Sequence, residues 1–177
     1  MTATGWLRAL ALVFVAAMLQ VVVVSSMVVA GGAADLLLVV VVALALLRGS
    51  LPGAVLGFVG GLVVDLATLG TLGVTSLVLT LGGFWAGRYG ETTGRGRRLA
   101  PIVAVGAITL LAGVFGYVLQ YLLDEDVVAR HALVTALAPA FVLNLLLALP
   151  VHRLARAIVG EELRAAPSSE VEVLAQP

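Results

Sequence analysis

Long apolar runs, separated by short polar or glycine-rich breaks, organise this chain of 177 residues. A run of about 20 apolar residues is long enough to cross a bilayer as a helix. The predicted spans are residues 6–29, 34–47, 52–69, 73–89, 101–123 and 131–152. The pattern predicts an all-α polytopic membrane protein of about six transmembrane helices, with residues 1–160 as a single transmembrane helical domain. Residues 161–177 are polar and are expected to form a disordered cytoplasmic tail.

Two of these runs have alternatives. Residues 34–47 are almost unbroken Leu and Val, but about 14 residues is short for a crossing, so a re-entrant or in-plane helix is the alternative. The first run follows Arg8 and precedes a small-residue segment, so it could be a cleaved signal peptide. Its apolar stretch, residues 9–24, is longer than the usual core of such a peptide. We therefore expect both runs to be membrane spans.

Composition agrees with the apolar pattern and excludes several kinds of chemistry. Hydrophobic residues make up 62% of the chain and charged residues 11%, whereas a soluble domain has about a quarter of its residues charged. The absence of Cys excludes disulfides and thiolate sites, and without Lys there is no phosphate-binding loop of the usual type. His131 beside residues 124–126 is interpreted as a solvated loop rather than a metal site. We expect no catalytic residue, no cofactor, no metal and no nucleic-acid partner.

Orientation follows from arginine placement, because short cytoplasmic loops retain arginine. With six spans, one side receives the termini and nine arginines: Arg8, Arg48, Arg88, Arg95, Arg97, Arg98, Arg153, Arg156 and Arg164. The other side receives Asp35, the turn at Gly70 and the acidic triplet at residues 124–126, with Arg130. Both termini are then cytoplasmic, and Arg88, Arg95, Arg97 and Arg98 form a cytoplasmic interface. Contact of the last three with anionic lipid is a secondary expectation.

The third predicted span carries a row of small residues that ends in an acid. Gly53, Gly57, Gly61 and Asp65 follow one another at steps of four, so they lie on one side of a helix. Glycine lets another helix approach closely, which favours association where the solvent is itself apolar. The row is therefore a predicted helix-docking face, either for a helix of this chain or for a partner.

Three further positions belong to the same packing hypothesis. Gly83 and Gly87 repeat the spacing of four in the next span, and Asn144 lies inside the last one, where an interhelical hydrogen bond is its ordinary explanation. Asp65 itself is costly in a membrane, about 2.5–3.5 kcal/mol at the bilayer centre. We favour a structural role in which it caps the turn near Gly70. A contact with another subunit and a transport or proton-relay role are the alternatives.

Five short motifs follow one another between residues 34 and 90: Asp35-Leu-Leu-Leu-Val-Val-Val-Val, Arg48-Gly, Gly57-Phe-x-x-Gly-x-x-x-Asp-Leu, Leu72-Gly and Gly83-Phe-x-Ala-Gly-Arg-Tyr. In this order and spacing they resemble the MreD family of bacterial rod shape-determining membrane proteins. The remainder of the chain agrees in length and hydropathy.

This resemblance implies a non-enzymatic membrane subunit of the machinery for lateral cell-wall elongation, located in the bacterial cytoplasmic membrane. It implies a fold similar to the substrate-binding subunits of energy-coupling-factor transporters. The expected partner is MreC, a single-span protein, and through it RodA, its penicillin-binding transpeptidase and the MreB machinery. The lipid bilayer is the surrounding solvent.

A substrate-binding membrane subunit of a vitamin-type transporter is the alternative function. Such a protein needs a cavity lined by several polar and aromatic side chains. The spans offer only four candidate polar residues: Gln20, Asp65, Gln120 and Asn144.

Overall fold

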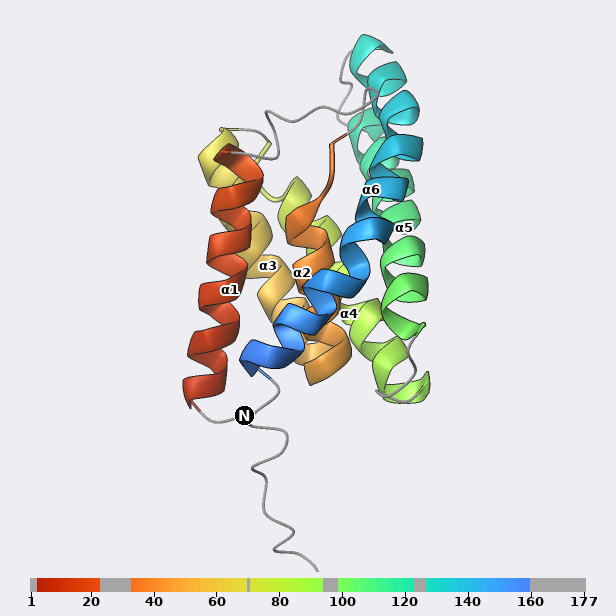
Figure 1. The fold of residues 1–177 in the computed structure, drawn as a ribbon. Helices are drawn as coiled ribbons and strands as arrows, with labels where there is room; N and C mark the ends of the chain where they lie inside the picture. The colour runs from red at the N-terminus through yellow and green to blue at the C-terminus, as the bar shows by residue number, and fades with distance from the viewer. Residues whose placement is uncertain (1–2, 23–32, 70, 94–98, 123–126, 160–177) are drawn as a thin grey trace, which may run out of the picture.

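The described residues form six helices, which run alternately up and down (Figure 1). The computed structural model describes residues 3–22, 33–69, 71–93, 99–122 and 127–159. The helices are α1 (Ala3–Val22), α2 (Leu36–Arg48), α3 (Ser50–Thr68), α4 (Val74–Thr93), α5 (Ala100–Leu122) and α6 (Val127–Val159). The predicted all-α class with six helices is confirmed.

The helix bounds differ from the predicted spans mainly at polar ends. α4 continues through residues 91–93, beyond the predicted span 73–89, and α6 continues past His152 to Val159. A helix does not have to end where its apolar stretch ends, because its last turns can lie in the interfacial region of the membrane. The acidic triplet, the arginines at 95, 97 and 98, and the tail after Gly160 lie outside the described residues.

Four segments within the described residues are long and apolar enough to cross a membrane. They are Ala3–Val22, Ser50–Thr68, Ala100–Leu119 and Leu137–Val159. α2 is shorter, and α4 carries Arg88 and Glu91 in its last turns. The chain therefore fits a multi-pass membrane protein.

α2 is the central helix. Residues 37–47 are all buried, none of them more than 4% exposed, and α2 contacts each of the other five helices. A helix that is apolar on every side is a buried one. Its 13 residues span about 20 Å, less than the hydrocarbon core. α2 runs lengthwise inside the bundle and touches protein along its length (Figure 1), so it does not lie on the surface of the bundle.

Hydrogen bonds from other helices hold the first turn of α2. The Gln20 side chain on α1 donates to the Ala34 carbonyl (3.1 Å) and accepts from the Leu36 N–H (2.8 Å). Asp35 caps the helix by accepting from the Leu38 N–H at 2.9 Å. The helix therefore starts at a fixed depth relative to α1.

The opposite end of α2 is fastened to the end of α6. Arg48, the last residue of α2, donates from its guanidinium to the Val159 carbonyl at 3.1 Å. That carbonyl belongs to the last turn of α6, where backbone acceptors lack helical partners. The charge-assisted bond ties the two helix ends together.

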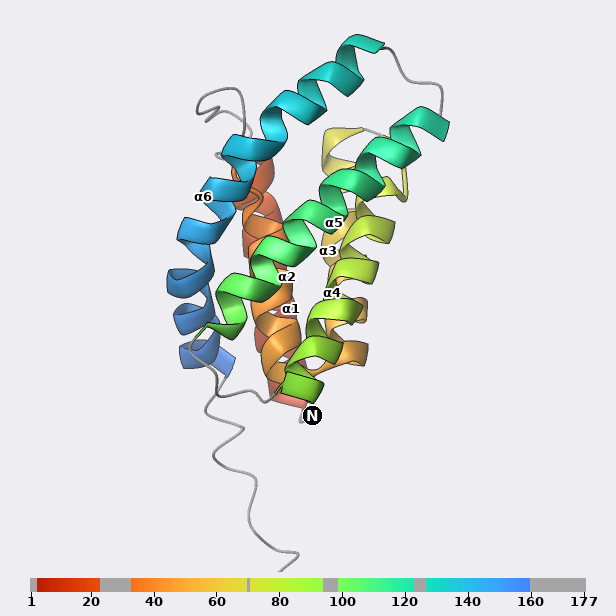
Figure 2. The same cartoon turned by 90° about the vertical axis from the view of Figure 1, so that its right-hand side faces the viewer.

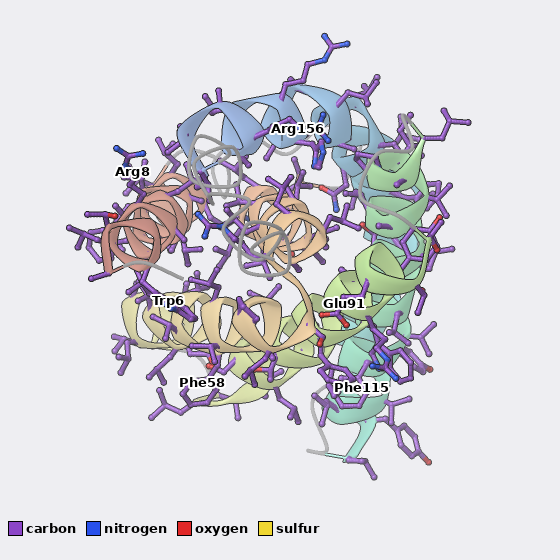
Figure 3. All side chains as sticks on the ribbon, turned by 90° about the horizontal axis from the view of Figure 1, so that it is seen from below. Trp6, Arg8, Phe58, Glu91, Phe115 and Arg156 are labelled. Carbon is purple, nitrogen blue, oxygen red and sulfur yellow. The ribbon has the colours of Figure 1, made fainter. Side chains whose placement is uncertain are left out.

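Five of the described arginines lie at one end of the bundle, whereas Arg130 is in the first turn of α6, at the opposite end. Arg8 is in the first turns of α1, Arg48 ends α2, Arg88 is near the end of α4, and Arg153 and Arg156 are near the end of α6. Figure 3 views the molecule from this end and labels Arg8 and Arg156. We call it the arginine-rich end. This segregation is the one that the six-span topology predicts, and it puts the start of α1 and the end of α6 together.

Single cysteines at the two ends of α4 test the topology. The chain has no native Cys, so Thr93→Cys and Leu72→Cys supply unique labelling sites. α4 is about 30 Å long, and Thr93 ends it while the exposed Leu72 precedes it. A membrane-impermeant thiol reagent should label Thr93→Cys only from the cytoplasmic side and Leu72→Cys only from the opposite side. Labelling of both from the same side would contradict a crossing by α4, and the unmodified chain is the blank.

Candidate functional site: the contact between α3 and α4

α3 and α4 make the most extensive helix contact of the bundle, and glycine is the reason. A Cβ atom placed on Gly53 would come within 3.0 Å of the Gly83 carbonyl oxygen, and one on Gly57 or Gly61 would collide with the backbone of Leu79 or Ser76. Real Cβ atoms essentially never approach so closely. The two backbones therefore touch, which only glycine permits.

The glycines of α4 complete the contact from the other side. A Cβ on Gly83 would meet the backbone of Gly53, and one on Gly87 would meet the backbone of Gly49 and Ser50. The row of glycines on α3 is thus used inside the chain, against an antiparallel neighbour. Of the two occupants that the sequence left open for this face, the helix of the same chain is the one found.

Asp65, at the end of the glycine row, caps the start of α4. Its carboxylate accepts from the N–H groups of Gly73 (2.9 Å), Thr75 (3.2 Å) and Ser76 (3.3 Å), and from the Ser76 hydroxyl (3.2 Å). The first N–H groups of a helix have no partner within it and attract negative charge. Asp65 is only 3% exposed and supplies that partner from α3. The sequence analysis favoured a role in which Asp65 caps the turn near Gly70. In the structure, the hydrogen bonds of Asp65 go to that turn and to the first residues of α4.

Glu91 forms the corresponding cap at the other end of the pair, and the sequence analysis missed it. Its carboxylate accepts from the Ser50 N–H at 2.8 Å and from the Ser50 hydroxyl at 3.1 and 3.3 Å, at the start of α3. Figure 3 shows Glu91 at the arginine-rich end. Each helix therefore receives its N-terminal cap from the last turns of the other.

A sequence signal for Glu91 existed. Gly83, Gly87 and Glu91 are spaced by four, as are Gly57, Gly61 and Asp65. Two helices with the motif Gly-x-x-x-Gly-x-x-x-acid, packed antiparallel on their glycine faces, place each acid beside the start of its neighbour. The signal was obscured because Glu91 stands next to a hydrophilic stretch and lies beyond the predicted span 73–89.

Asn144 joins three helices at the start of α2. It is 1% exposed; its Oδ1 accepts from the Asp35 N–H (2.7 Å) and its Nδ2 donates to the Thr109 hydroxyl on α5 (3.2 Å). The interhelical hydrogen bond predicted for this residue is present. Thr109 was not singled out from sequence, because an isolated Thr in a span gives no signal of its partner.

The polar residues that a transporter would need are used elsewhere. Gln20, Asp65 and Asn144 all bond to backbone groups at helix starts, as described above, and the side chain of Gln120 lies outside the description. Among the described residues no group of three His, Asp or Glu residues could hold a metal. His131 also has no described side chain. The hydrogen bonds of this site hold helices in place.

Comparison with protein families identifies the chain. Residues 2–158 match the family model described as rod shape-determining protein MreD. The chain belongs to the MreD family. No curated protein and no solved structure matches it. The similarity of the MreD fold to energy-coupling-factor substrate-binding subunits thus stays a prediction, whereas the family assigned from residues 34–90 is confirmed over nearly the whole chain.

Bulky residues in the glycine row should separate α3 from α4. Gly57→Leu and Gly61→Leu place side chains into the backbone of α4, and overpacking of this kind costs about 1–3 kcal/mol or more. Thermal unfolding in detergent should show a clearly lowered midpoint or little folded protein. Gly116→Leu on α5 is the matched control, because its Cβ meets nothing within 4 Å. Equal stability of all three variants would contradict the backbone contact.

The two capping acids should differ in importance. Asp65→Leu leaves the start of α4 without its partner inside the bundle and should cost about 2 kcal/mol, near the upper range for lost caps. Asp65→Asn keeps an acceptor oxygen and should be milder. Glu91→Leu should cost less than Asp65→Leu, because Glu91 is exposed and water replaces it. Unfolding midpoints of the three variants check this order, and a harmless Asp65→Leu would contradict the capping role.

Proposed function

We propose that this MreD family member is a non-enzymatic membrane subunit of the bacterial cell-wall elongation machinery and maintains cell shape. The observation that carries the proposal is the match of residues 2–158 to the rod shape-determining family. An all-helical apolar bundle agrees with it, since the described chain is almost entirely helix. The work of such a subunit is to bind and position other proteins.

MreC is the partner we propose for direct contact. RodA, its penicillin-binding transpeptidase and MreB are linked through the same assembly, which organises lateral peptidoglycan synthesis. We place the chain in the cytoplasmic membrane with both termini cytoplasmic. The arginine-rich end supports this orientation, because arginine is retained on the cytoplasmic side.

We propose that the α3–α4 pair acts indirectly in partner binding. Its glycine row, Gly53, Gly57 and Gly61 with Asp65, is covered by α4, so a partner helix docks on another face. The large side chains that remain outside include Phe58 on α3 and Phe84 on α4. The pair holds these side chains in a fixed arrangement, and Gly83 and Gly87 contribute to the same rigidity.

Depletion and complementation in a rod-shaped host test the function. Loss of the native family member should round the cells, and expression of this chain should restore rods and co-purify with MreC. Gly57→Leu should fail in both assays, while Gly116→Leu should succeed. Cells that stay rod-shaped after depletion would overturn the proposal. Retention of a small vitamin-like molecule on purification, without MreC, would favour the transporter alternative.

A further inference from the structure

A shallow apolar groove lies between α4 and α5. Its volume is about 90 Å³, room for about three water-sized groups. Gly82 and Ala112 form part of its wall, with Trp85, Leu111 and Phe115 around them. A Cβ on Gly82 would meet Ile108 at 2.8 Å, so the two helices touch at that level. In Figure 2, α5 runs obliquely across α4.

The charged side chain of Arg88 lies on α4 beyond one end of this groove. Arg88 follows Trp85 by one turn on α4, and at 100° per residue it lies within about 20° of the direction of Leu81, which lines the groove. Arg88 is exposed, and its guanidinium has no hydrogen bond or ion pair within the described part of the chain. From Val78 to Arg88 the groove face of α4 extends about 15 Å towards the arginine-rich end.

Trp85 lies on α4 between the rest of the groove and Arg88. Trp85 is 55% exposed and packs edge-on against Phe84, with ring centroids 5.9 Å apart. Tryptophan prefers the boundary between hydrocarbon and headgroups. An apolar groove, a boundary tryptophan and a cation therefore follow one another along one face of α4.

We propose that this face binds an acidic phospholipid of the leaflet at the arginine-rich end. A short segment of one acyl chain lies in the groove against Gly82, Ala112 and Phe115, and the lipid phosphate pairs with Arg88. Basic residues beside grooves between transmembrane helices bind anionic headgroups in this way. A water-soluble ligand fits less well, because the groove wall is apolar. The site does not depend on the proposed role in cell shape.

Native mass spectrometry of the purified chain tests the proposal. The protein is titrated with phosphatidylglycerol or with phosphatidylcholine of the same acyl chains, and lipid adducts are counted. Phosphatidylglycerol should bind more tightly than phosphatidylcholine. Arg88→Gln should weaken it about fivefold, the equivalent of about 1 kcal/mol for one basic residue at an anionic surface, while phosphatidylcholine binding stays unchanged.

Matched variants separate this site from general attraction to charge. Arg153→Gln removes an exposed arginine at the same end but on α6, and it should leave the adducts unchanged. Ala112→Leu fills the groove and should weaken phosphatidylglycerol even with Arg88 intact. Thermal unfolding establishes that each variant is folded. If Ala112→Leu is not folded, Trp85→Ala takes its place.

Equal binding of the two lipids, or equal effects of Arg88→Gln and Arg153→Gln, would overturn the proposal. Unchanged lipid binding by folded Ala112→Leu or Trp85→Ala, with loss of MreC, would assign the groove to a partner helix instead.

Discussion

The backbone contact between α3 and α4 is the constraint on which the bundle depends. In a membrane, burying one apolar helix against another gains nothing from the hydrophobic effect, since lipid tails are as apolar as Leu. What remains is close packing and hydrogen bonding, and both are concentrated here. Gly57 and Gly83 let the backbones touch, while Asp65 and Glu91 close the two ends. An uncapped helix start inside the hydrocarbon region would leave N–H groups without any partner, which lipid cannot supply.

The central position of α2 follows from this pair. α2 packs on both α3 and α4, and the other three helices complete its burial. A helix of 13 residues does not match the bilayer by itself. α2 does not have to match the bilayer thickness, because longer helices surround it and its ends contact protein. Gln20 and Asn144 satisfy the backbone at one end and Arg48 reaches α6 at the other. The buried polar residues therefore fix the depth of a helix that hydropathy alone leaves undetermined.

Much of the fold could be predicted from sequence, because hydropathy, glycine spacing and arginine placement are local signals. Six helices, the docking face at Gly53, Gly57 and Gly61, and the gathering of most arginines at one end all come from short windows. What could not be predicted is which neighbour each face meets. A row of glycines has the same spacing whether it receives a helix of the chain or of a partner, and residues 37–47 would be equally apolar facing lipid. Glu91 was missed for a related reason: its role depends on Ser50, a residue about forty positions away and on another helix.

Use of the glycines inside the chain bears on how the proposed assembly role can work. A glycine face can pack closely against almost any helix with small residues. In this chain, the glycine faces of α3 and α4 pack against each other. The described outer surface exposes large apolar side chains such as Phe58 and Trp85, for which lipid is an equally good solvent. A partner can distinguish such a surface from lipid only by its shape, and the shape depends on the rigidity of the helices below. In the proposed assembly role, the capped α3–α4 pair is then a requirement for specific recognition, although its glycines pack against each other's helices and not on the outer surface.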